Sequence, residues 1–487
     1  MERRDSFYIG GEWVAPASSQ LIEVVSPHTE EVIATVPDGT PADMDAAVVA
    51  ARRAFDGSDW SAMSFPQRAE IVQRFADLYA ARLTDMADVI TAEMGSPASF
   101  SQLAQSPAPW MMLTTFLGIA NDYPWEEERV GVLGSPVIVR SEPVGVVAAI
   151  VPWNVPQFVI MSKLAPALLT GCTMVIKPAP ETPLDSYLMA ELLDEAGVPD
   201  GVVNIVAGGR ETGEYLVKHP GIDKVAFTGS TAAGRRIAAI CGEQLKRCSL
   251  ELGGKSAAII LDDADLASTM DGLKFASLMN NGQACVAQTR ILASRDRYTE
   301  VVDALAELVG GLAVGDPTDP NTDVGPLVAE RQQERVEKYI ALGQEEGARV
   351  VAGGSGRPSG IERGWYVRPT VFADVNNDMR IAREEIFGPV LTVIPFDTVD
   401  DAVRIANDSE YGLAGSVWTG DIDAGMDVAR RVRTGTYGIN QYTMDFVAPF
   451  GGFKASGLGR EFGKEGLEHY TELKSIVAPG GGVPAAG

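Results

Sequence analysis

Short apolar segments alternate with longer amphipathic segments from residue 143 onward. VGVVAAIV is typical of a buried strand, and QFVIMSKLAPALL predicts a helix that ends at Gly171. Further strands are predicted at TMVIKP, VVNIVAG and KVAFTG. Each is followed by a predicted helix, which is LDSYLMAELLDEAG after the first, a short helix after the second, and TAAGRRIAAI after the third. Strands separated by helices of this length form βαβ units in a parallel sheet, an architecture that binds nucleotides at the carboxyl ends of its strands.

A second alternating region follows residue 255. SAAIIL, TRILAS, TVIPF and AGSVWT predict strands, and a helix is expected to run up to Asn280. The chain therefore predicts two α/β domains with a cleft between them. In the N-terminal part, apolar side chains recur in helical register across residues 66–94, which predicts one long amphipathic helix that ends at Gly95.

The size and charge of the chain limit what it can be. Its 487 residues are too many for one simple core, so two or three structural regions are expected. The formal net charge is 40 minus 66, or −26, which repels phosphate backbones and anionic lipid. The first residues, MERRDSFYIGGEW, lack the apolar core of a signal peptide, and PVGVVAAIVPW is too short to span a bilayer. Neither nucleic acid nor a membrane is expected as a partner.

The cysteines and histidines exclude two further classes of site. Cys172, Cys241, Cys248 and Cys285 show neither CxxC spacing nor the density of a disulfide scaffold, which fits free thiols in a reducing cytoplasm. The three histidines lie in unrelated segments, so no metal site is expected. A free cysteine is usually a small core residue, and this interpretation is kept for the first three.

Cys285 stands apart because small and amide side chains surround it in MNNGQACVAQTR. A nucleophilic thiol needs an environment that lowers its pKa, but no histidine is close in sequence. Glu251, in LELGGKS, lies 285 minus 251, or 34, residues upstream. Because a carboxylate raises the pKa of a neighbouring thiol, Glu251 is better suited to activating water in a later step. Asn154, in the proline-flanked VPWNVP, has an amide that could donate to an oxyanion, although a turn with a packed tryptophan is the alternative.

Other segments carry weaker signals. FTGSTAAG places Gly229 and Gly234 around a strand-to-helix turn whose N–H groups can face a phosphate. The usual dinucleotide motif GxGxxG is absent, so an ordinary turn is the commoner explanation for this segment alone. Lys177, in IKPAPET, follows a strand and could reach ribose or phosphate, although exposed lysines at strand ends are common. Glu385 precedes a turn in EEIFGPV, and PFGGFKASGLGRE is a glycine-rich loop. Neither of the last two indicates a chemistry alone.

Taken together, these segments resemble the aldehyde dehydrogenase superfamily. Seven segments fall in the family's order and at its spacing from about residue 145 to 475. They are PWNVP, KPAPET, FTGSTAAG, LELGGKS, NNGQAC, EEIFGPV and PFGGFKASGLGRE. The resemblance implies an α/β fold with a Rossmann-like cofactor-binding domain at 1–119 and 144–254 and an α/β catalytic domain at 255–469. It also implies a small β oligomerisation flap at 120–143 and 470–487, and hence a homodimer or homotetramer.

The resemblance implies NAD(P)⁺-dependent oxidation of a small-molecule aldehyde to a carboxylate. Cys285 would attack the aldehyde carbon, and the Asn154 amide with the backbone N–H of Cys285 would hold the oxyanion. Hydride transfer to nicotinamide would leave a thioester, and Glu251 would activate the water that hydrolyses it. Lys163, in SKLAPAL, matches a lysine often placed near the catalytic centre, and a role in proton movement is expected.

The resemblance also implies a set of cofactor-binding residues. Lys177 would bond the adenine ribose, and Gly229 with Ser230 would meet the pyrophosphate. Glu385 would hold the nicotinamide ribose, with Phe387 packing nearby. The other residues expected to bind the cofactor are Val151, Trp153, Gly209, Gly213, Gly234 and Leu252.

Two departures from the family pattern bear on specificity. NAD-preferring members commonly have glutamate three residues after the lysine, where this chain has Pro180, with Glu181 one residue later. NAD⁺ is still expected because no arginine stands nearby in the sequence, and NADP⁺ stays open. Val155, Val159 and Ser162 stand where many relatives have larger side chains. A wider channel for bulky or aromatic aldehydes is therefore expected, unless Tyr442 and Phe446 refill the space.

Three alternatives remain. An acylating dehydrogenase would pass the thioester to coenzyme A, but such members generally lack the base corresponding to Glu251. A non-catalytic binding protein of this fold would be expected to lose the cysteine, the base or the amide, and all three are present. A cysteine hydrolase explains Cys285 but not the segments that resemble a dinucleotide site.

Overall fold

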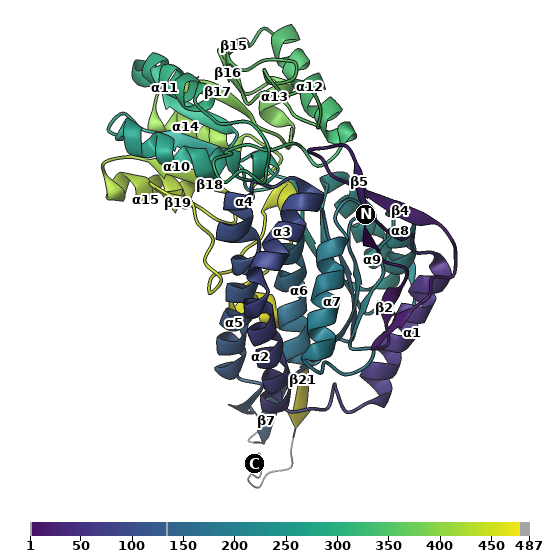
Figure 1. The fold of residues 1–487 in the computed structure, drawn as a ribbon. Coiled ribbons are helices and arrows are strands. Elements are labelled where there is room, and N and C mark those ends of the chain that lie inside the picture. The colour runs from purple at the N-terminus through teal and green to yellow at the C-terminus, as the bar shows by residue number, and fades with distance from the viewer. Residues whose placement is uncertain (1, 133–134, 478–487) are drawn as a thin grey trace.

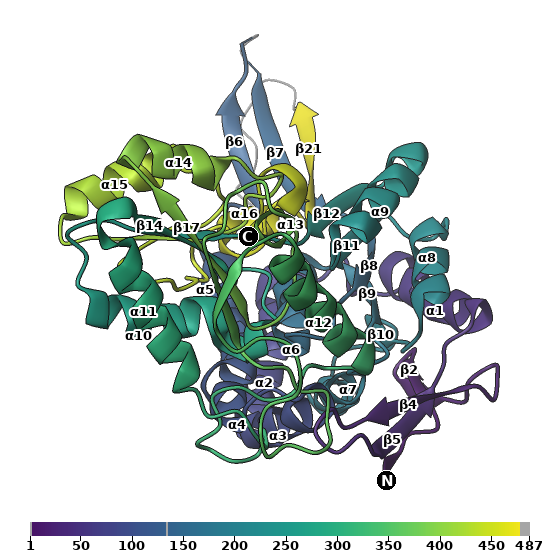
Figure 2. The same ribbon diagram turned by 90° about the horizontal axis from the view of Figure 1, so that it is seen from above.

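The computed structural model describes residues 2–132 and 135–477, which form two α/β lobes and a narrow projecting sheet (Figures 1 and 2). The sheet of the first lobe has the order β20-β12-β11-β8-β9-β10-β2-β3. β8 to β12 are parallel, as the βαβ pattern predicts, whereas β2, β3 and β20 pair in antiparallel fashion. The bounds are β2 (Phe7–Ile9), β3 (Glu12–Val14), β8 (Val146–Ile150), β9 (Thr173–Lys177), β10 (Val203–Ile205), β11 (Lys224–Thr228), β12 (Arg247–Glu251) and β20 (Gly457–Leu458).

Helices cover both faces of this sheet. One group is α1 (Pro41–Gly57), α8 (Arg210–Lys218) and α9 (Thr231–Gln244). The other is α2 (Phe65–Ala81), α3 (Leu83–Met94), α5 (Pro107–Asn121), α6 (Pro156–Thr170) and α7 (Leu184–Glu195). Because strand side chains alternate between faces, Val146 and Ala148 pack with the first group, and Val147 and Ala149 pack with the second. Burial on both faces explains why this strand has a continuous apolar sequence.

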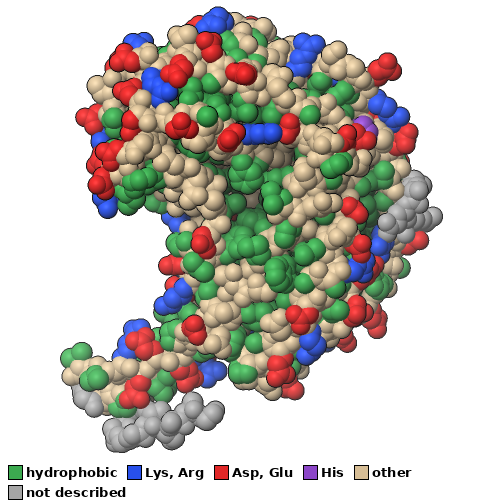
Figure 3. Space-filling view, turned by 60° about the vertical axis from the view of Figure 1, so that its left-hand side comes forward, with side chains coloured by type: hydrophobic (Ala, Val, Ile, Leu, Met, Phe, Trp, Pro, Cys, Tyr) green, Lys and Arg blue, Asp and Glu red, His purple; other side chains and the backbone are tan. Residues whose placement is uncertain are grey.

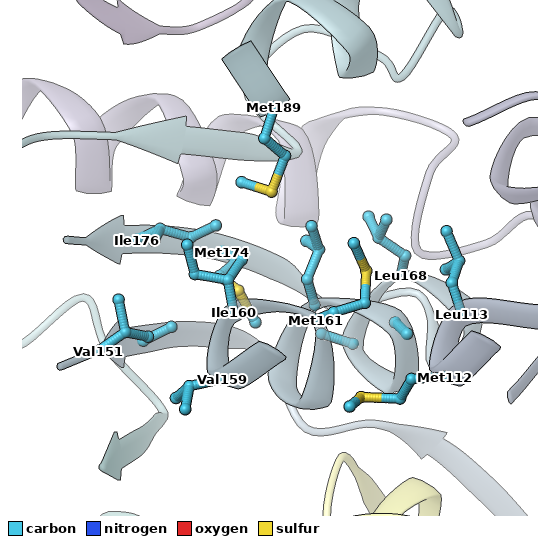
Figure 4. Packing of buried hydrophobic residues seen from close by; sticks show 14 of the residues in the cluster. Met112, Leu113, Val151, Val159, Ile160, Met161, Leu168, Met174, Ile176 and Met189 are labelled. Atoms are coloured by element: carbon cyan, nitrogen blue, oxygen red, sulfur yellow. The ribbon is translucent and has the colours of Figure 1, made fainter. Parts of the chain in front are cut away.

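The core of the second group is visible in Figure 4, where α6 packs against β9. Val159, Ile160, Met161 and Leu168 of α6 lie beside Met174 and Ile176 of β9 and beside Met112 and Leu113 of α5. α6 ends at Gly171 in the left-handed conformation, as the sequence predicts. The short α4 (Ala98–Phe100) and the π-helix η1 (Ser101–Gln105) join α3 to α5, and α16 (Gly463–Glu468) packs on α5 and α6.

The second lobe has a sheet of order β15-β16-β17-β14-β13-β18-β19. Its strands are β13 (Ala257–Ile260), β14 (Arg290–Ser294), β15 (Arg349–Ala352), β16 (Thr370–Ala373), β17 (Val390–Phe396), β18 (Gly415–Trp418) and β19 (Gly438–Ile439). Its helices are α10 (Leu266–Leu278), α11 (Tyr298–Gly310), α12 (Glu330–Glu345), α13 (Arg380–Arg383), α14 (Val399–Asn407) and α15 (Ile422–Arg431). The 3-10 turns are η2 (Met279–Gly282), η3 (Arg295–Arg297) and η4 (Lys454–Ser456). The four strands predicted from the sequence are β13, β14, β17 and β18.

The narrow sheet has the order β21-β7-β6, with β6 (Glu126–Val130), β7 (Pro136–Pro143) and β21 (Thr471–Val477). These strands lie within the two segments expected to form a flap, of which residues 133–134 and 478–487 fall outside the described residues. A separate small sheet joins β1 (Glu2–Arg3), β5 (Val32–Pro37) and β4 (Leu21–Val25). β20, in the segment expected to be catalytic, pairs with β12 in the first sheet. The division into domains stays a prediction.

The expectation of one helix over residues 66–94 is wrong, because the chain forms α2 and α3 there. Arg82, with φ −118° and ψ 20°, leaves the helical region, and its N–H donates to the Tyr79 carbonyl at 3.0 Å. Apolar side chains recur at helical spacing on both sides of Arg82, so the sequence pattern did not reveal the break between the two helices. The predicted end at Gly95 is right, since this residue is left-handed and its N–H donates to Thr91 at 3.0 Å. Across residues 2–132 and 135–477, no helix is long and apolar enough to cross a membrane.

Candidate active site

A cavity of about 240 Å³ lies where the parallel strands of the first sheet end, beside the second lobe. Eight of the predicted site residues line it, namely Trp153, Asn154, Gly229, Ser230, Leu252, Cys285, Glu385 and Phe387. Figure 3 shows one face of the molecule, on which hydrophobic side chains gather in the hollow between the lobes and acidic side chains spread over the convex surface. The fold therefore brings together residues from segments more than 200 positions apart in the sequence.

Cys285 follows a strained turn. The helix expected to reach Asn280 ends at Leu278, and Asn280 and Asn281 both have positive φ values, 54° and 61°. Asn281 fixes this turn, because its amide donates to the carbonyls of Gly95 (2.9 Å) and Pro326 (2.8 Å). On the other side, a Cβ at Gly254 would lie 2.4 Å from the Cys285 carbonyl oxygen. The turn thus presents the thiol at a defined place in the cavity.

Asn154 is joined to the same turn by hydrogen bonds. Its Nδ2 donates to the carbonyl oxygen of Gln283 at 3.0 Å. Its own carbonyl oxygen accepts from Asn280 Nδ2 at 2.8 Å and from Gln105 Nε2 at 3.2 Å. Because all four residues lie in one network, the Asn154 amide and Cys285 occupy fixed positions on the wall of one cavity.

The thiol is protonated in this environment. Burial, with smaller contributions from the carboxyl groups of Glu385 and Glu251, raises the pKa of Cys285 to about 12. Cys285 also contacts the apolar core that contains Val159 and Tyr442. A base or a bound positive group is therefore required before the sulfur can act as a nucleophile at neutral pH.

Glu251 is the last residue of β12 and does not line the cavity, whereas Leu252 and Gly253, which follow it in the chain, do. It is buried, and neither of its carboxyl oxygens has a hydrogen-bond partner within the described part of the chain. Burial raises its pKa well above the ordinary value, and the nearby carboxylate of Glu461 raises it further. Lys163 forms a buried ion pair with Glu461 and donates to Thr228 Oγ1 at 2.8 Å. The predicted base and the predicted lysine thus belong to one buried charged cluster.

Lys177 lies at the other end of the cavity region. Its Nζ donates to the carbonyls of Gly208 (2.7 Å) and Pro178 (2.8 Å), and burial lowers its pKa to about 8. Gly213 lies against it, since a Cβ there would be 3.3 Å from the lysine side chain. Gly209 is the residue before α8, and the N–H of Val151 donates to the Lys177 carbonyl at 3.2 Å. These four predicted residues form one cluster outside the cavity lining.

The amino terminus of α9 opens toward the cavity. Ser230 caps this helix, and its hydroxyl accepts from the N–H of Ala233 at 3.3 Å. Gly234 lies one turn inside the helix, where a Cβ would meet the Leu252 side chain at 2.4 Å. The N–H of Gly229 donates to the carbonyl of Glu251 at 3.0 Å. Small residues therefore let α9 approach the loop after β12 closely.

Glu385 and Phe387 come from the second lobe. Glu385 is held by the N–H of Gly254, which donates to its Oε1 at 2.9 Å. Phe387 has a positive φ of 66°, and its ring meets Trp153 edge to face with centroids 5.4 Å apart. This contact is a direct bridge between the lobes across the cavity.

Sequence analysis missed Gln332 and Arg335, which line the cavity from α12. Gln332 Nε2 donates to the Phe387 carbonyl at 2.8 Å, and Arg335 Nε donates to the Ile386 carbonyl at 3.1 Å. No motif marks them, because their helix has an ordinary polar surface sequence. No arginine lies near Pro180 in the sequence, but the fold brings Arg331 into an ion pair with the adjacent Glu181 at 2.6 Å.

The donor set fits a dinucleotide. It has a buried ammonium group at Lys177, the free N–H groups of a 14-residue helix at Ser230, and a half-buried carboxyl group at Glu385. These groups suit ribose hydroxyls and a diphosphate. Among the described residues, no group of three His, Cys, Asp or Glu side chains is arranged to hold a metal ion.

Comparison with known proteins identifies the family. The sequence profile of the aldehyde dehydrogenase family matches residues 13–476. A geranial dehydrogenase from Castellaniella defragrans is 49% identical over 473 residues, which cover 97% of this chain and 98% of that protein.

Two solved structures have the same fold. The structure of a Mycobacterium tuberculosis aldehyde dehydrogenase complexed with NAD⁺ is 50% identical, with a TM-score of 0.97, covering 99% of this chain and 100% of the other. An aldehyde dehydrogenase mutant from Pseudomonas syringae, complexed with NAD⁺ and octanal, is 43% identical, with a TM-score of 0.95 over 98% of each chain. The chain therefore belongs to the aldehyde dehydrogenase family and is an oxidoreductase.

Proposed function

We propose that this protein oxidises an aldehyde to a carboxylic acid with NAD⁺, through a thiohemiacetal and a thioester on Cys285. The observation that carries the proposal is that Cys285, Asn154 and Glu385 line one cavity, and that the buried Glu251 precedes Leu252 and Gly253 of its lining and is within electrostatic reach of Cys285. NAD⁺ is the cofactor named for both of the solved relatives described above. When bound, it supplies the acceptor for the hydride.

Cys285 forms the bond to substrate. The thiol loses its proton to solvent, and its sulfur attacks the aldehyde carbon, while the carbon–oxygen double bond opens and the aldehyde oxygen becomes an oxyanion. The Asn154 amide and the backbone N–H of Cys285 stabilise that oxyanion. Asn154 suits this role because its hydrogen bonds to Gln283 and Asn280 fix it before substrate arrives.

Glu251 activates the water that hydrolyses the thioester. A carboxyl group with a raised pKa is a better base at neutral pH than an ordinary one. Lys163 and Glu461 lie next to it, and we propose that this ion pair accepts the proton that Glu251 removes from water. Hydrolysis then breaks the bond between sulfur and carbon, returns Cys285 to its thiol form with the second hydrogen of the water, and releases the product as a carboxylate.

The remaining predicted residues hold the cofactor. Lys177, with Val151, Gly209 and Gly213, is proposed to bind the adenosine ribose. The turn at Gly229 and Ser230 before α9 is proposed to bind the diphosphate, with Gly234 and Leu252 packed below it. Glu385, Phe387 and Trp153 are proposed to bind the nicotinamide riboside.

We further propose that the substrate has an extended or branched apolar chain. Val155 and Val159 line the cavity beside Cys285, and they leave room that larger side chains would fill. Ser162 does not contribute to this space, because it is buried and its hydroxyl donates to the Val159 carbonyl at 2.8 Å. Phe446 does not line the cavity and packs instead against Phe158, with ring centroids 6.0 Å apart. Octanal and geranial, named for two relatives, have chains of this kind.

We also propose that the protein is a cytoplasmic homo-oligomer assembled through the narrow sheet. Its four cysteines are free thiols, which suits a reducing compartment. β6 is exposed along its whole length, and Val130, Leu473 and Val477 expose 97%, 69% and 68% of their surfaces. Apolar side chains on an unpaired sheet edge favour association with a second chain.

The test is the initial rate at which NADH forms from NAD⁺, or NADPH from NADP⁺, with acetaldehyde, octanal, geranial or benzaldehyde as substrate and without coenzyme A. Cys285→Ala should abolish turnover, whereas the matched variant Cys248→Ala should retain it. Turnover that appears only when coenzyme A is added would contradict hydrolysis and support the acylating alternative. A preference for acetaldehyde over octanal would contradict the proposed substrate class.

A further inference from the structure

An ion pair joins the two lobes near the proposed cofactor site. Arg331 Nη2 lies 2.6 Å from Glu181 Oε1. Arg331 is in the first turn of α12, and Glu181 is in the loop after β9. In Figure 2, α12 lies along the border between the lobes. The Glu181 side chain is 17% exposed and the Arg331 side chain is 60% exposed, so the arginine covers the carboxylate from the solvent side.

Both partners lie next to groups proposed to bind the dinucleotide. Glu181 is within electrostatic reach of Lys177 and opposes the lowering of that lysine's pKa by burial. On α12, Gln332 and Arg335 line the cavity that contains Cys285. A dinucleotide held both at Lys177 and in the cavity of Cys285 would therefore lie beside the Glu181–Arg331 ion pair.

The rest of α12 is attached to the other end of the same site. Gln332 donates to the Phe387 carbonyl at 2.8 Å, and Arg335 donates to the Ile386 carbonyl at 3.1 Å. Arg331 thus connects a helix already bound to the Glu385–Phe387 segment with the loop beside Lys177. Breaking this connection releases the loop from the second lobe without removing a group that lines the cavity.

We propose that the Glu181–Arg331 ion pair is a latch that holds the two lobes together over the bound dinucleotide and slows its release. The inference rests on the proposed placement of the cofactor. Glu181 and Arg331 are positioning residues in this account, because neither lines the cavity that contains the reacting thiol.

The direction of the effect separates a latch from simple electrostatics. The dinucleotide is an anion, so the loss of the Arg331 charge alone would speed its release, and the loss of the Glu181 charge alone would slow it. A latch fails when either partner is removed. Arg331→Gln and Glu181→Gln should therefore both speed release, by about three- to fivefold, the range available to a partly exposed ion pair.

The experiment measures NADH dissociation by stopped-flow fluorescence, with excess NAD⁺ as the displacing ligand. The variants are Arg331→Gln, Glu181→Gln and the double variant, which should release NADH no faster than either single variant. Arg349→Gln is the matched control, because Arg349 forms an exposed ion pair with Asp374 at 2.8 Å on the second lobe. Its rate should equal that of the unchanged protein. Raising the salt concentration should speed release from the unchanged protein by a larger factor than from the double variant, because only the unchanged protein has the ion pair to screen.

Three results would overturn the latch. Glu181→Gln could slow release, the two single effects could add in the double variant, or Arg331→Gln could match Arg349→Gln. Lys177→Gln separates this failure from a failure of the proposed function. If Lys177→Gln binds NADH as tightly as the unchanged protein, the cofactor placement is wrong and the latch falls with it. If Lys177→Gln weakens NADH binding while Arg331→Gln and Glu181→Gln release NADH at the rate of the unchanged protein, only the latch is wrong.

Discussion

Removing Lys163 provides a quantitative test of the buried charged cluster behind the active site. Its side chain is 0% exposed and that of its partner Glu461 is 7% exposed. Lys163→Met keeps the length of the side chain but leaves the Glu461 carboxylate buried without its counter-charge. That carboxylate also lies near Glu251, whose pKa it already raises. Removing one partner of a buried ion pair costs about 3–5 kcal/mol, so we expect a loss of this size in the free energy of unfolding.

The assay is urea unfolding followed by tryptophan fluorescence. The double variant Lys163→Met with Glu461→Gln removes both charges and should recover most of the loss, because the uncompensated charge is its cause. Lys338→Met is the control, since Lys338 pairs with Glu334 at 3.3 Å on an exposed helix face, where such a pair is worth about 0.3–0.5 kcal/mol. The reasoning is refuted if Lys163→Met unfolds at the same urea concentration as Lys338→Met, or if the double variant is no more stable than the single one.

Three further predictions concern the thiol, the base and the loop between them. The first concerns Cys285, whose pKa is raised to about 12. The rate at which iodoacetamide alkylates this thiol without cofactor should therefore rise about tenfold per pH unit from about pH 7 to 10. A rate that becomes constant below pH 9 would contradict this. Burial raises the pKa of Glu251, so the folded protein keeps a proton that the unfolded chain releases, and stability falls as pH rises above about 4.5. Glu251→Gln removes that loss and should raise the melting temperature more at pH 8 than at pH 5; an equal change at both would count against it. Gly254→Ala would place a methyl group 2.4 Å from the carbonyl oxygen of Cys285 and should lower kcat about 10²-fold. Gly57→Ala is the control, because a methyl group at Gly57 would point into open space, and it should leave kcat unchanged.

The regular part of the fold could be predicted because its strands are buried on both faces. β8 and β9 appear in the sequence as continuous apolar runs, and each is followed by a helix with a glycine stop at its end. β20, by contrast, has two residues and follows no such pattern. It pairs with β12 because the chain returns to the first lobe after residue 456, and this return depends on tertiary contacts rather than local sequence.

The site could be predicted only where its residues belong to recognisable segments. Asn154, Cys285 and Glu385 lie in turns at the ends of strands and helices, where unusual residues are visible in the sequence. Gln332 reaches the cavity because α12 is docked against the turn at Phe387, and nothing in its own helix indicates this. Glu461 is likewise 298 positions from Lys163 in the sequence. The ion pair between them, which lies near the proposed base Glu251, is therefore visible only in the three-dimensional structure.

The electrostatics of the site suggest an order for the proposed steps. Burial is the largest cause of the raised pKa values of both Cys285 and Glu251, so the site accepts negative charge reluctantly. An ionised Glu251 raises the pKa of the thiol, and the two groups therefore oppose each other's ionisation. Attack by sulfur is easiest while Glu251 is still protonated. The thiol is neutral before the attack, so burial and the carboxylate of Glu461, rather than the sulfur, oppose the ionisation of Glu251. After the thioester forms, an ionised Glu251 no longer raises the pKa of a reacting thiol, so the charge that would hinder attack does not hinder hydrolysis.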